Sequence, residues 1–339
     1  MRWRLAGIFL DVVGDIPRRR ILTARADPEP GHPLEVLAVR PVEAGTLLPD
    51  QQAEVVTLRC GGSLLWVMMG LMAGADEAAR GLDVSVPNAA RMYDYFLGGK
   101  DNFEADRVTA GKLLALVPQL GQSVVENRRF IGRVVRFLAA EAGIDQFLDI
   151  GAGLPTRDPV HQVAQKINPC ARVVYADYDP VVVTHGSALL AVPDRSVMVR
   201  ADLRRPGELL ARSEVRGFLD LGRPVAVMLI AIMHFVPDSD DPYGIVAALR
   251  DGLAPGSYLA MVHLSGDFVE QDAAAEAVSI YEHASARLRP RSKAEILRFF
   301  DGFELVPPGL VPKHDWRPDD IGSRYRTSNV SWGGVGRKK

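Results

Sequence analysis

Apolar and polar residues alternate along most of this chain in the pattern of short buried strands followed by amphipathic helices. Residues 147–150 are apolar apart from Asp149 and predict a short buried strand. Beyond the next glycines, four apolar residues recur with the spacing of one helix face: Val160, Val163, Ala164 and Ile167. We expect Asp158 to cap this helix and Pro159 to occupy its first position.

The same alternation continues towards the end of the chain. Strands are predicted at residues 172–176, 196–200, 225–232, 258–263 and within 327–335. Helices are predicted at about 180–190 and 243–253, and Ser292 with Glu295 has the spacing of a capping box before another helix. Residues 225–232 are the most apolar run and predict a central strand. The pattern predicts an α/β fold with a Rossmann-like doubly wound sheet, whose ligand lies at the carboxyl ends of the strands.

Three helices are expected ahead of this sheet. Asn88 is placed to cap the first, and a glycine pair follows it. The second helix runs to about Leu116, and the third covers about 123–142. We therefore expect an N-terminal helical lid at residues 83–142 and a ligand-binding domain at residues 143–337.

Residues 1–71 have a different composition from the rest of the chain. Candidate elements, such as an extended piece at residues 34–39, are interrupted by five prolines: Pro28, Pro30, Pro33, Pro41 and Pro49. We expect a poorly ordered extension or a misassigned start upstream of Met72. A small regulatory module is the alternative.

The turn after the first strand of the sheet has the composition of a nucleotide-binding loop. Gly151 and Gly153 leave bare backbone at a helix start, where a ligand can approach closely. A dinucleotide fingerprint has a third glycine or alanine where this chain has Thr156, after Pro155. Asp149 would repel a pyrophosphate, but its carboxylate can accept hydrogen bonds from an ammonium group. The loop therefore favours a ligand with a cationic amino group, with an ordinary strand–turn–helix as the alternative.

Acidic residues end three successive predicted strands: Asp149, Asp177 and Asp202. The carboxyl ends of adjacent parallel strands lie side by side, so these carboxylates should line one crevice. Asp177 lies 24 residues after Gly153, where folds of this kind place the acid that binds the ribose hydroxyls. We expect Asp202 and the Leu203 amide to bind an adenine ring and Tyr178 to stack on it.

Composition and charge narrow the range of functions. A net charge of −2 and a pI near 6.4 give no basic footprint for nucleic acid. The two cysteines, Cys60 and Cys170, indicate neither a disulfide scaffold nor a zinc site and fit a cytoplasmic protein. The uncharged residues 61–75 are fewer than the about 20 needed to span a bilayer. We expect a cytoplasmic protein that binds no metal, nucleic acid or membrane, and its many arginines and alanines suggest a bacterial source.

Several segments resemble a known family. The run Asp149-x-Gly-x-Gly, Asp177, Asp202 and residues 253–259 are similar to successive motifs of class I methyltransferases that depend on S-adenosyl-L-methionine (SAM). Residues from about 83 to 337 resemble, more narrowly, an uncharacterised bacterial S-adenosyl methyltransferase family, formerly a domain-of-unknown-function group. The resemblance is carried by residues 91–103, 126–128, 147–156, 160–161, 234–237 and 241–246. It implies a class I fold with SAM as the cofactor, and residues 157–159 depart from the family pattern.

The sequence indicates catalytic residues less clearly than it indicates cofactor-binding residues. Methyl transfer requires an acceptor held in line with the sulfonium, and a base only if that acceptor carries a proton. His234, after the central strand, is the best-placed base, and His263, at the end of the next strand, is the second choice. A structural role is the alternative for either histidine. Ala231, at the end of the central strand, is expected beside the cofactor.

Polar residues of the N-terminal helices have no evident role in a core. We expect five of them to cover the methionine end of SAM and the substrate pocket: Arg91, Tyr93, Tyr95, Asp101 and Asn102. A plain helix pair with capping residues is the alternative.

The expected function is the transfer of a methyl group from SAM to a small-molecule acceptor, whose identity and reacting atom the sequence leaves open. A noncatalytic SAM-binding regulator is the first alternative. The second is an NAD-dependent oxidoreductase, which Asp149 and the missing third glycine disfavour.

Overall fold

The computed structural model describes residues 83–156, 158–319 and 329–339, together with the backbone of six strands within residues 2–70. The chain divides into two compact units, residues 1–81 and 82–339. The first unit contains two antiparallel sheets, ordered β1-β2-β3 and β4-β5-β6. Their strands are β1 (Arg2–Leu5), β2 (Ile8–Ile16), β3 (Arg19–Ala26), β4 (Glu35–Pro41), β5 (Ala53–Cys60) and β6 (Ser63–Gly70). The extended piece predicted at residues 34–39 overlaps β4, and the segments between these strands lie outside the described residues.

The second unit is built on one sheet with the order β12-β14-β11-β10-β7-β8-β9, and a short strand, β13, pairs with β14. The five strands from β7 to β11 are parallel, whereas β14 runs antiparallel to β11, β12 and β13. Their bounds are β7 (Gln146–Ile150), β8 (Arg172–Asp177), β9 (Ser196–Arg200), β10 (Ala226–Ile230), β11 (Tyr258–Leu264), β12 (Phe303–Leu305), β13 (Val311–Pro312) and β14 (Ser331–Lys338). The chain order reverses between β7 and β10, which is the arrangement of a doubly wound sheet. The predicted α/β fold is confirmed.

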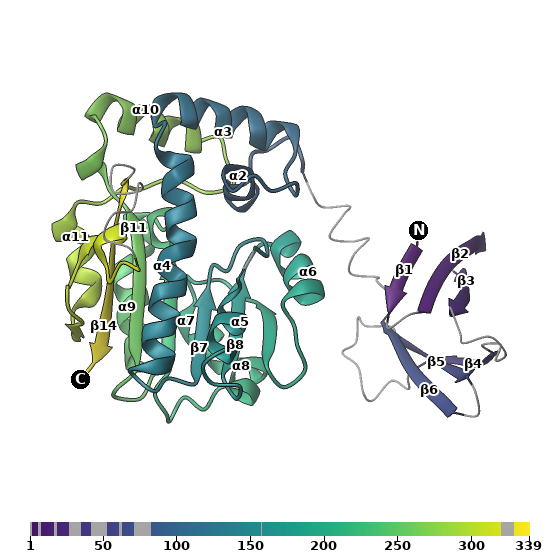
Figure 1. Ribbon diagram of the computed structural model, residues 1–339. Coiled ribbons are helices and arrows are strands. Elements are labelled where there is room, and N and C mark those ends of the chain that lie inside the picture. Colours follow the sequence, from purple (N-terminus) through teal and green to yellow (C-terminus); the bar gives the residue numbers. More distant parts are fainter. Residues whose placement is uncertain are drawn as a thin grey trace. The chain divides into compact units, whose positions relative to one another are not determined.

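Helices cover both faces of this sheet (Figure 1). One face carries α4 (Leu120–Ala140), α5 (Val160–Gln165) and α6 (Pro180–Leu189). The other face carries α7 (Pro206–Ala211), α8 (Ser213–Phe218), α9 (Pro242–Asp251) and α11 (Lys293–Leu297). Among the described residues, no helix combines the length and apolar character that a membrane span requires.

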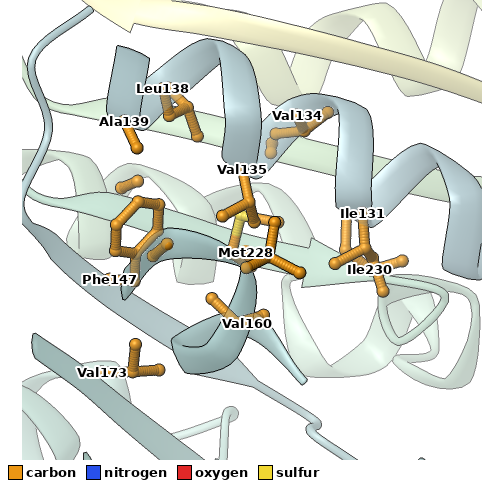
Figure 2. Close-up of a cluster of buried hydrophobic side chains, with 14 of the residues drawn as sticks. Ile131, Val134, Val135, Leu138, Ala139, Phe147, Val160, Val173, Met228 and Ile230 are labelled. Carbon is orange, nitrogen blue, oxygen red and sulfur yellow. The ribbon is translucent and has the colours of Figure 1, made fainter. Parts of the chain in front are cut away.

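The longest described helix, α4, packs along the sheet with one apolar face (Figure 2). The residues of that face recur with helical spacing: Ile131, Val134, Val135, Leu138 and Ala139. They pack among side chains of the strands and of α5: Phe147, Val160, Val173, Met228 and Ile230. The central strands β7 and β10 are buried along their whole length, as continuous apolar runs require in a sheet covered on both faces.

A third cluster of apolar side chains joins the N-terminal helices to a helix from the second half of the chain. The helices are α2 (Ala89–Phe96), α3 (Glu104–Leu116) and α10 (Gln271–Tyr281), which lie together in Figure 1. Met92, Leu113 and Tyr281 are buried in this cluster, and Phe235 and Leu264 of the sheet domain pack against it. The N-terminal helices are therefore anchored by apolar contacts with the rest of this unit.

Several local predictions can be compared with the observed helix ends. Asn88 caps α2 by accepting hydrogen bonds from two backbone amides, and Ser292 forms the expected capping box with Glu295. The prediction that Asp158 caps α5 is wrong, because its φ of 51° turns the chain before the helix and no side-chain cap bond forms. Pro159 occupies the capping position, and the six-residue helix ends before Ile167, which is 38% exposed.

We expect truncation of the core below α4 to destabilise the protein strongly. Phe147 is fully buried, so Phe147→Ala should lower the free energy of unfolding by about 3–5 kcal/mol through lost contacts and a residual cavity. Leu189→Ala is the matched control, because Leu189 is 65% exposed at the end of α6. Chemical denaturation of both variants measures the difference, and equal losses would contradict this description of the core.

Candidate active site

Two glycines in the turn after β7 adopt left-handed backbone conformations. Gly151 has a φ of 72° and Gly153 a φ of 66°, which side chains rarely allow. A Cβ at Gly151 would lie 2.6 Å from Ile232, whereas a Cβ at Gly153 would meet no atom within 4 Å. The backbone at Gly153 therefore borders open space into which a ligand can fit.

Two buried carboxyl groups stand beside this turn, as expected from the strand ends. Asp177 accepts hydrogen bonds from the backbone amides of Gly153 and Asp179, each at 3.0 Å. Burial raises the pKa of Asp177 to about 6, although the two amides oppose the rise. Burial also raises the pKa of Asp149 to about 7; the nearby Arg128 guanidinium opposes this rise, and the charge of Asp177 adds to it.

The third predicted acid has a different environment. Both carboxylate oxygens of Asp202 accept hydrogen bonds from the Arg204 side chain, and this contact lowers the pKa of Asp202. Its carboxylate is therefore already paired with Arg204, and the expected contact with adenine stays a prediction. The Leu203 side chain is buried in the core below α7, while Tyr178 is 45% exposed and available for stacking.

The remaining members of the predicted loop are Pro155 and Thr156, both partly buried. Arg157, where the sequence departs from the family pattern, lies outside the described residues. Arg128 of α4 reaches over this region and donates a hydrogen bond to the carbonyl oxygen of Asp158 at 3.3 Å.

The chain leaves the central strand β10 through a strained residue. Ala231 has a φ of 59°, although it is not glycine, and its amide donates to the carbonyl oxygen of Val262 at 2.9 Å. Such a conformation persists only where the surroundings impose it, and it occurs preferentially at functional sites. It ends β10 at Ile230, two residues before the predicted end of the strand. The short helix η1 (Met233–Phe235) follows directly.

A cavity brings together one residue from each predicted group of site residues. Tyr93 of the lid, Ala231 of the cofactor set and His234 of the catalytic set all line it. The other lining residues come from α2, α4, η1, β11, α10 and the start of β14 with the residue before it: Ala89, Phe96, Leu120, Ser123, Val124, Asn127, Phe235, Leu264, Tyr281, Val330 and Ser331. The wall is mostly apolar and aromatic, with a few polar groups, as is usual for a small-molecule site.

His234 lines this cavity, and one of its ring nitrogens accepts a hydrogen bond within the protein. Its Nδ1 accepts a hydrogen bond from the Leu264 amide at 3.3 Å, and burial keeps its pKa well below 6.5. The imidazole is therefore neutral, with its proton on Nε2. The engaged lone pair of Nδ1 argues against a general base at His234, whose catalytic role stays a prediction.

His263 is fully buried and does not line the cavity. Its Nδ1 donates to the Leu264 carbonyl oxygen at 2.6 Å, and its Nε2 accepts from Arg291 at 3.1 Å. Burial lowers its pKa to about 3. With both nitrogens paired inside the protein, His263 is a structural residue, which corrects its expected catalytic role.

Arg291 itself was not anticipated from the sequence. Its guanidinium donates to the carbonyl oxygens of Met233 and Val236, at 3.1 and 2.9 Å, and to Asp238 at 2.6 Å. It therefore fixes the η1 segment that carries His234. A single arginine in a loop 53 residues after Asp238 offers no local pattern from which this contact could be predicted.

Most of the predicted lid residues contact other residues of the N-terminal helices, not the cavity. Arg91 is buried and forms an ion pair with Asp106 at 2.7 Å. The backbone amide of Asp101 and the side chain of Asn102 both donate to Asp94, each at 2.8 Å. These residues, with Tyr95 packed against the apolar cluster of the N-terminal helices, stabilise the helix pair and do not line the cavity. Only Tyr93 of the five reaches it.

Two further groups at the cavity were missed from the sequence. The Oδ1 atom of Asn127 is buried and has no hydrogen-bond partner, which leaves an acceptor free for a ligand donor. Lys313, one residue after β13, donates to two serines of the cavity wall. Asn127 and Arg128 belong to a segment that carries the family resemblance, whereas Lys313 lies in a stretch without any recognisable motif. Within the described residues, no cluster of three potential metal ligands occurs.

We expect the strain at Ala231 to be measurable. Ala231→Gly should raise the free energy of unfolding by about 1 kcal/mol, because glycine adopts the left-handed conformation without a Cβ penalty. Ala226→Gly in the same strand should lower it instead, since Ala226 is fully buried in extended backbone. Thermal and chemical denaturation distinguish the two variants, and destabilisation of both would argue against strain.

Comparisons with known proteins identify the family of this chain. The family model of the S-adenosyl methyltransferases matches residues 75–339. A DUF574 family protein from Streptomyces avermitilis is 42% identical with a TM-score of 0.72, over 76% of this chain and 99% of that one. A candidate methyltransferase from Thermobifida fusca is 45% identical with a TM-score of 0.71, over 76% of this chain and 97% of that one. None of the curated proteins matches the sequence.

These two solved structures share the fold and a large part of the sequence, and the family model covers both the N-terminal helices and the sheet domain. The glycine turn, the two buried carboxyl groups and the adjoining cavity all fall within the matched residues. The chain belongs to the S-adenosyl methyltransferase family, and it is a SAM-dependent methyltransferase with a class I fold.

Proposed function

We propose that this methyltransferase acts on a small, uncharged and largely apolar acceptor that binds in the cavity between α2, η1 and α10. The observation that carries the proposal is the shared lining of this cavity by Tyr93, Ala231 and His234, next to the glycine turn. SAM supplies an electrophilic methyl group on its sulfonium when it is bound. The protein's part is to orient the acceptor and to exclude water.

The residues around the turn fit SAM from end to end. Asp149 and the buried oxygen of Asn127 can accept from its ammonium group, and Arg128 can pair with its carboxylate. Asp177 can accept from the ribose hydroxyls while it holds the Gly153 amide. The backbone at Gly151, Gly153, Pro155 and Thr156 would give close approach, and Tyr178, Leu203 and Asp202 would contact the adenine.

The N-terminal helices would cover the acceptor. Residues 83–142 form the lid in this proposal, with Tyr93 as the lid residue that contacts ligand. Arg91, Tyr95, Asp101 and Asn102 act inside the lid by holding its two short helices together. Residues 143–337 form the SAM-binding domain.

We also propose a cytoplasmic, bacterial protein that does not bind nucleic acid. The net charge of −2 and the free, exposed Cys170 support this proposal, as do the two bacterial relatives.

Calorimetric titration of the full-length protein tests the cofactor site. We expect S-adenosylhomocysteine (SAH) to bind and NAD not to bind. Asp177→Ala should weaken SAH binding by about 10- to 100-fold, because charge-assisted hydrogen bonds to the ribose are lost. Asp251→Ala is the control, since that carboxylate is exposed at the end of α9. Unchanged SAH affinity in Asp177→Ala would contradict the proposed ribose contact.

SAH binding should also depend on pH through the two buried carboxyl groups. Asp149 must be ionised to accept from an ammonium group, and its pKa of about 7 means that acid protonates it. We expect the affinity to be about tenfold lower at pH 6 than at pH 8, and Asp177 adds to this trend below its pKa of about 6. Asp149→Asn should bind SAH weakly at both pH values. An affinity that is independent of pH in the unaltered protein would rule out Asp149 as the ammonium partner.

A further inference from the structure

A lysine is buried directly behind the wall of the cavity. Lys313 lies in η5 (Lys313–Asp315) and is 1% exposed. Its Nζ donates hydrogen bonds to the hydroxyl oxygens of Ser123 on α4 and of Ser331 on β14, the latter at 3.2 Å. Both serines line the cavity that we assign to the acceptor. The two hydroxyl groups therefore connect the lysine to any group bound there.

The surroundings of Lys313 do not neutralise a positive charge. Among the described residues, no carboxylate forms an ion pair with the ammonium group of Lys313. Glu126 is the nearby carboxylate, and it is paired with Arg133 at 2.8 Å. The other titratable groups close to it are His234 on η1 and its own neighbours His314 and Asp315. Burial lowers the pKa of Lys313 to about 7, and Glu126 offsets part of this shift. Near neutral pH a substantial fraction of this amine is uncharged.

The rest of the cavity indicates the shape of the acceptor. Aromatic rings of Phe96, Phe235 and Tyr281 line it, together with aliphatic side chains of α4. No Asp, Glu, Lys or Arg is among its lining residues. A flat, uncharged molecule with one polar group is chemically complementary to this lining, because its ring can pack on the aromatic wall while its polar group meets the serines.

His234, which lines the same cavity, can donate a hydrogen bond but has no unengaged nitrogen to accept a proton. Neutral His234 carries its proton on Nε2 and can donate a hydrogen bond to a ligand oxygen, but it cannot take up the acceptor's proton there. A hydroxyl acceptor must lose a proton during methylation, so a different group has to receive it.

We propose that Ser123 and Ser331 bind the hydroxyl group of an aromatic acceptor and that Lys313 receives its proton through them. This inference rests on the proposed function of the cavity. The acceptor oxygen forms a bond to the methyl carbon as the carbon–sulfur bond breaks, and the electron pair of that bond stays on sulfur. The hydroxyl proton passes to one serine oxygen, and the proton of that serine passes to the uncharged amine of Lys313. The products are a methyl ether, SAH and a lysine ammonium group.

Lys313 is a positioning and proton-accepting residue in this scheme, since it acts through the serines. Its ionisation can be measured without an acceptor by NMR titration of the ε-carbons in protein labelled with ¹³C-lysine. The chain has only seven lysines, and the signal missing from Lys313→Met assigns the resonance. We expect this signal to titrate near pH 7. A Lys313 signal that does not titrate near neutral pH would overturn the proposal.

The second test uses 3-nitrophenol as the probe acceptor. The full-length protein with SAH should bind it, and with SAM should convert it to 3-nitroanisole, with kcat rising through about pH 7 as Lys313 loses its proton. In Lys313→Met, kcat should fall by about 100-fold or more, with KM for the phenol and SAH affinity unchanged. The remaining activity should follow ionisation of the phenol itself. Ser123→Ala with Ser331→Ala should reproduce the loss, and Lys166→Met, at an exposed site, should not.

The outcomes separate this inference from the proposed function. Absence of SAH binding would defeat the proposed site as a whole. SAH binding without 3-nitrophenol binding or methylation, or a Lys313→Met variant with unchanged kcat and pH profile, would overturn the lysine–serine relay alone. Lys313→Met replaces a buried amine with an apolar side chain of similar length, so we expect it to fold.

Discussion

The hydrogen bond from the Gly153 amide to the Asp177 carboxylate connects the glycine turn to the end of the neighbouring strand. The same carboxylate accepts from the Asp179 amide, and Asp179 in turn caps α6 and accepts from the Asn88 side chain at 2.6 Å. One series of contacts thus links the turn to Asn88, the residue that caps α2 of the lid. The position of α2 over the cavity depends on these contacts, which no single element could provide.

A rise in pH converts two buried groups of this site, Asp149 and Lys313, into the forms that the proposed function requires. Above about pH 7 Asp149 becomes a carboxylate that can hold a cationic ligand, and Lys313 becomes an uncharged amine that can accept a proton. Desolvation causes both shifts, because it disfavours whichever form is charged. A dry site therefore places a carboxyl group and an amine at similar pKa values, although their ordinary values differ widely.

Most of the polar residues singled out on the N-terminal helices stabilise those helices. Helices as short as α2 depend on tertiary contacts and caps for their stability. Asn88, Arg91 and Asp94 supply these contacts through Asp106 and the loop before α3. Their density in the sequence resembled a binding surface, but most of them stabilise the helix pair. Tyr93 reaches the cavity because it shares one face of α2 with Ala89 and Phe96, four residues before and three after it, which also line the cavity.

The sequence by itself determined the order of strands and helices, the glycine turn and the acids at the strand ends. These features follow from local periodicity, from backbone conformations that favour glycine, and from the parallel arrangement that puts strand ends side by side. Only the tertiary structure decided which polar groups are free. His234, His263 and Asp202 are engaged by Leu264, Arg291 and Arg204, respectively. Lys313 meets Ser123 across 190 residues, and hydrogen bonding over such a separation leaves no pattern in a single sequence.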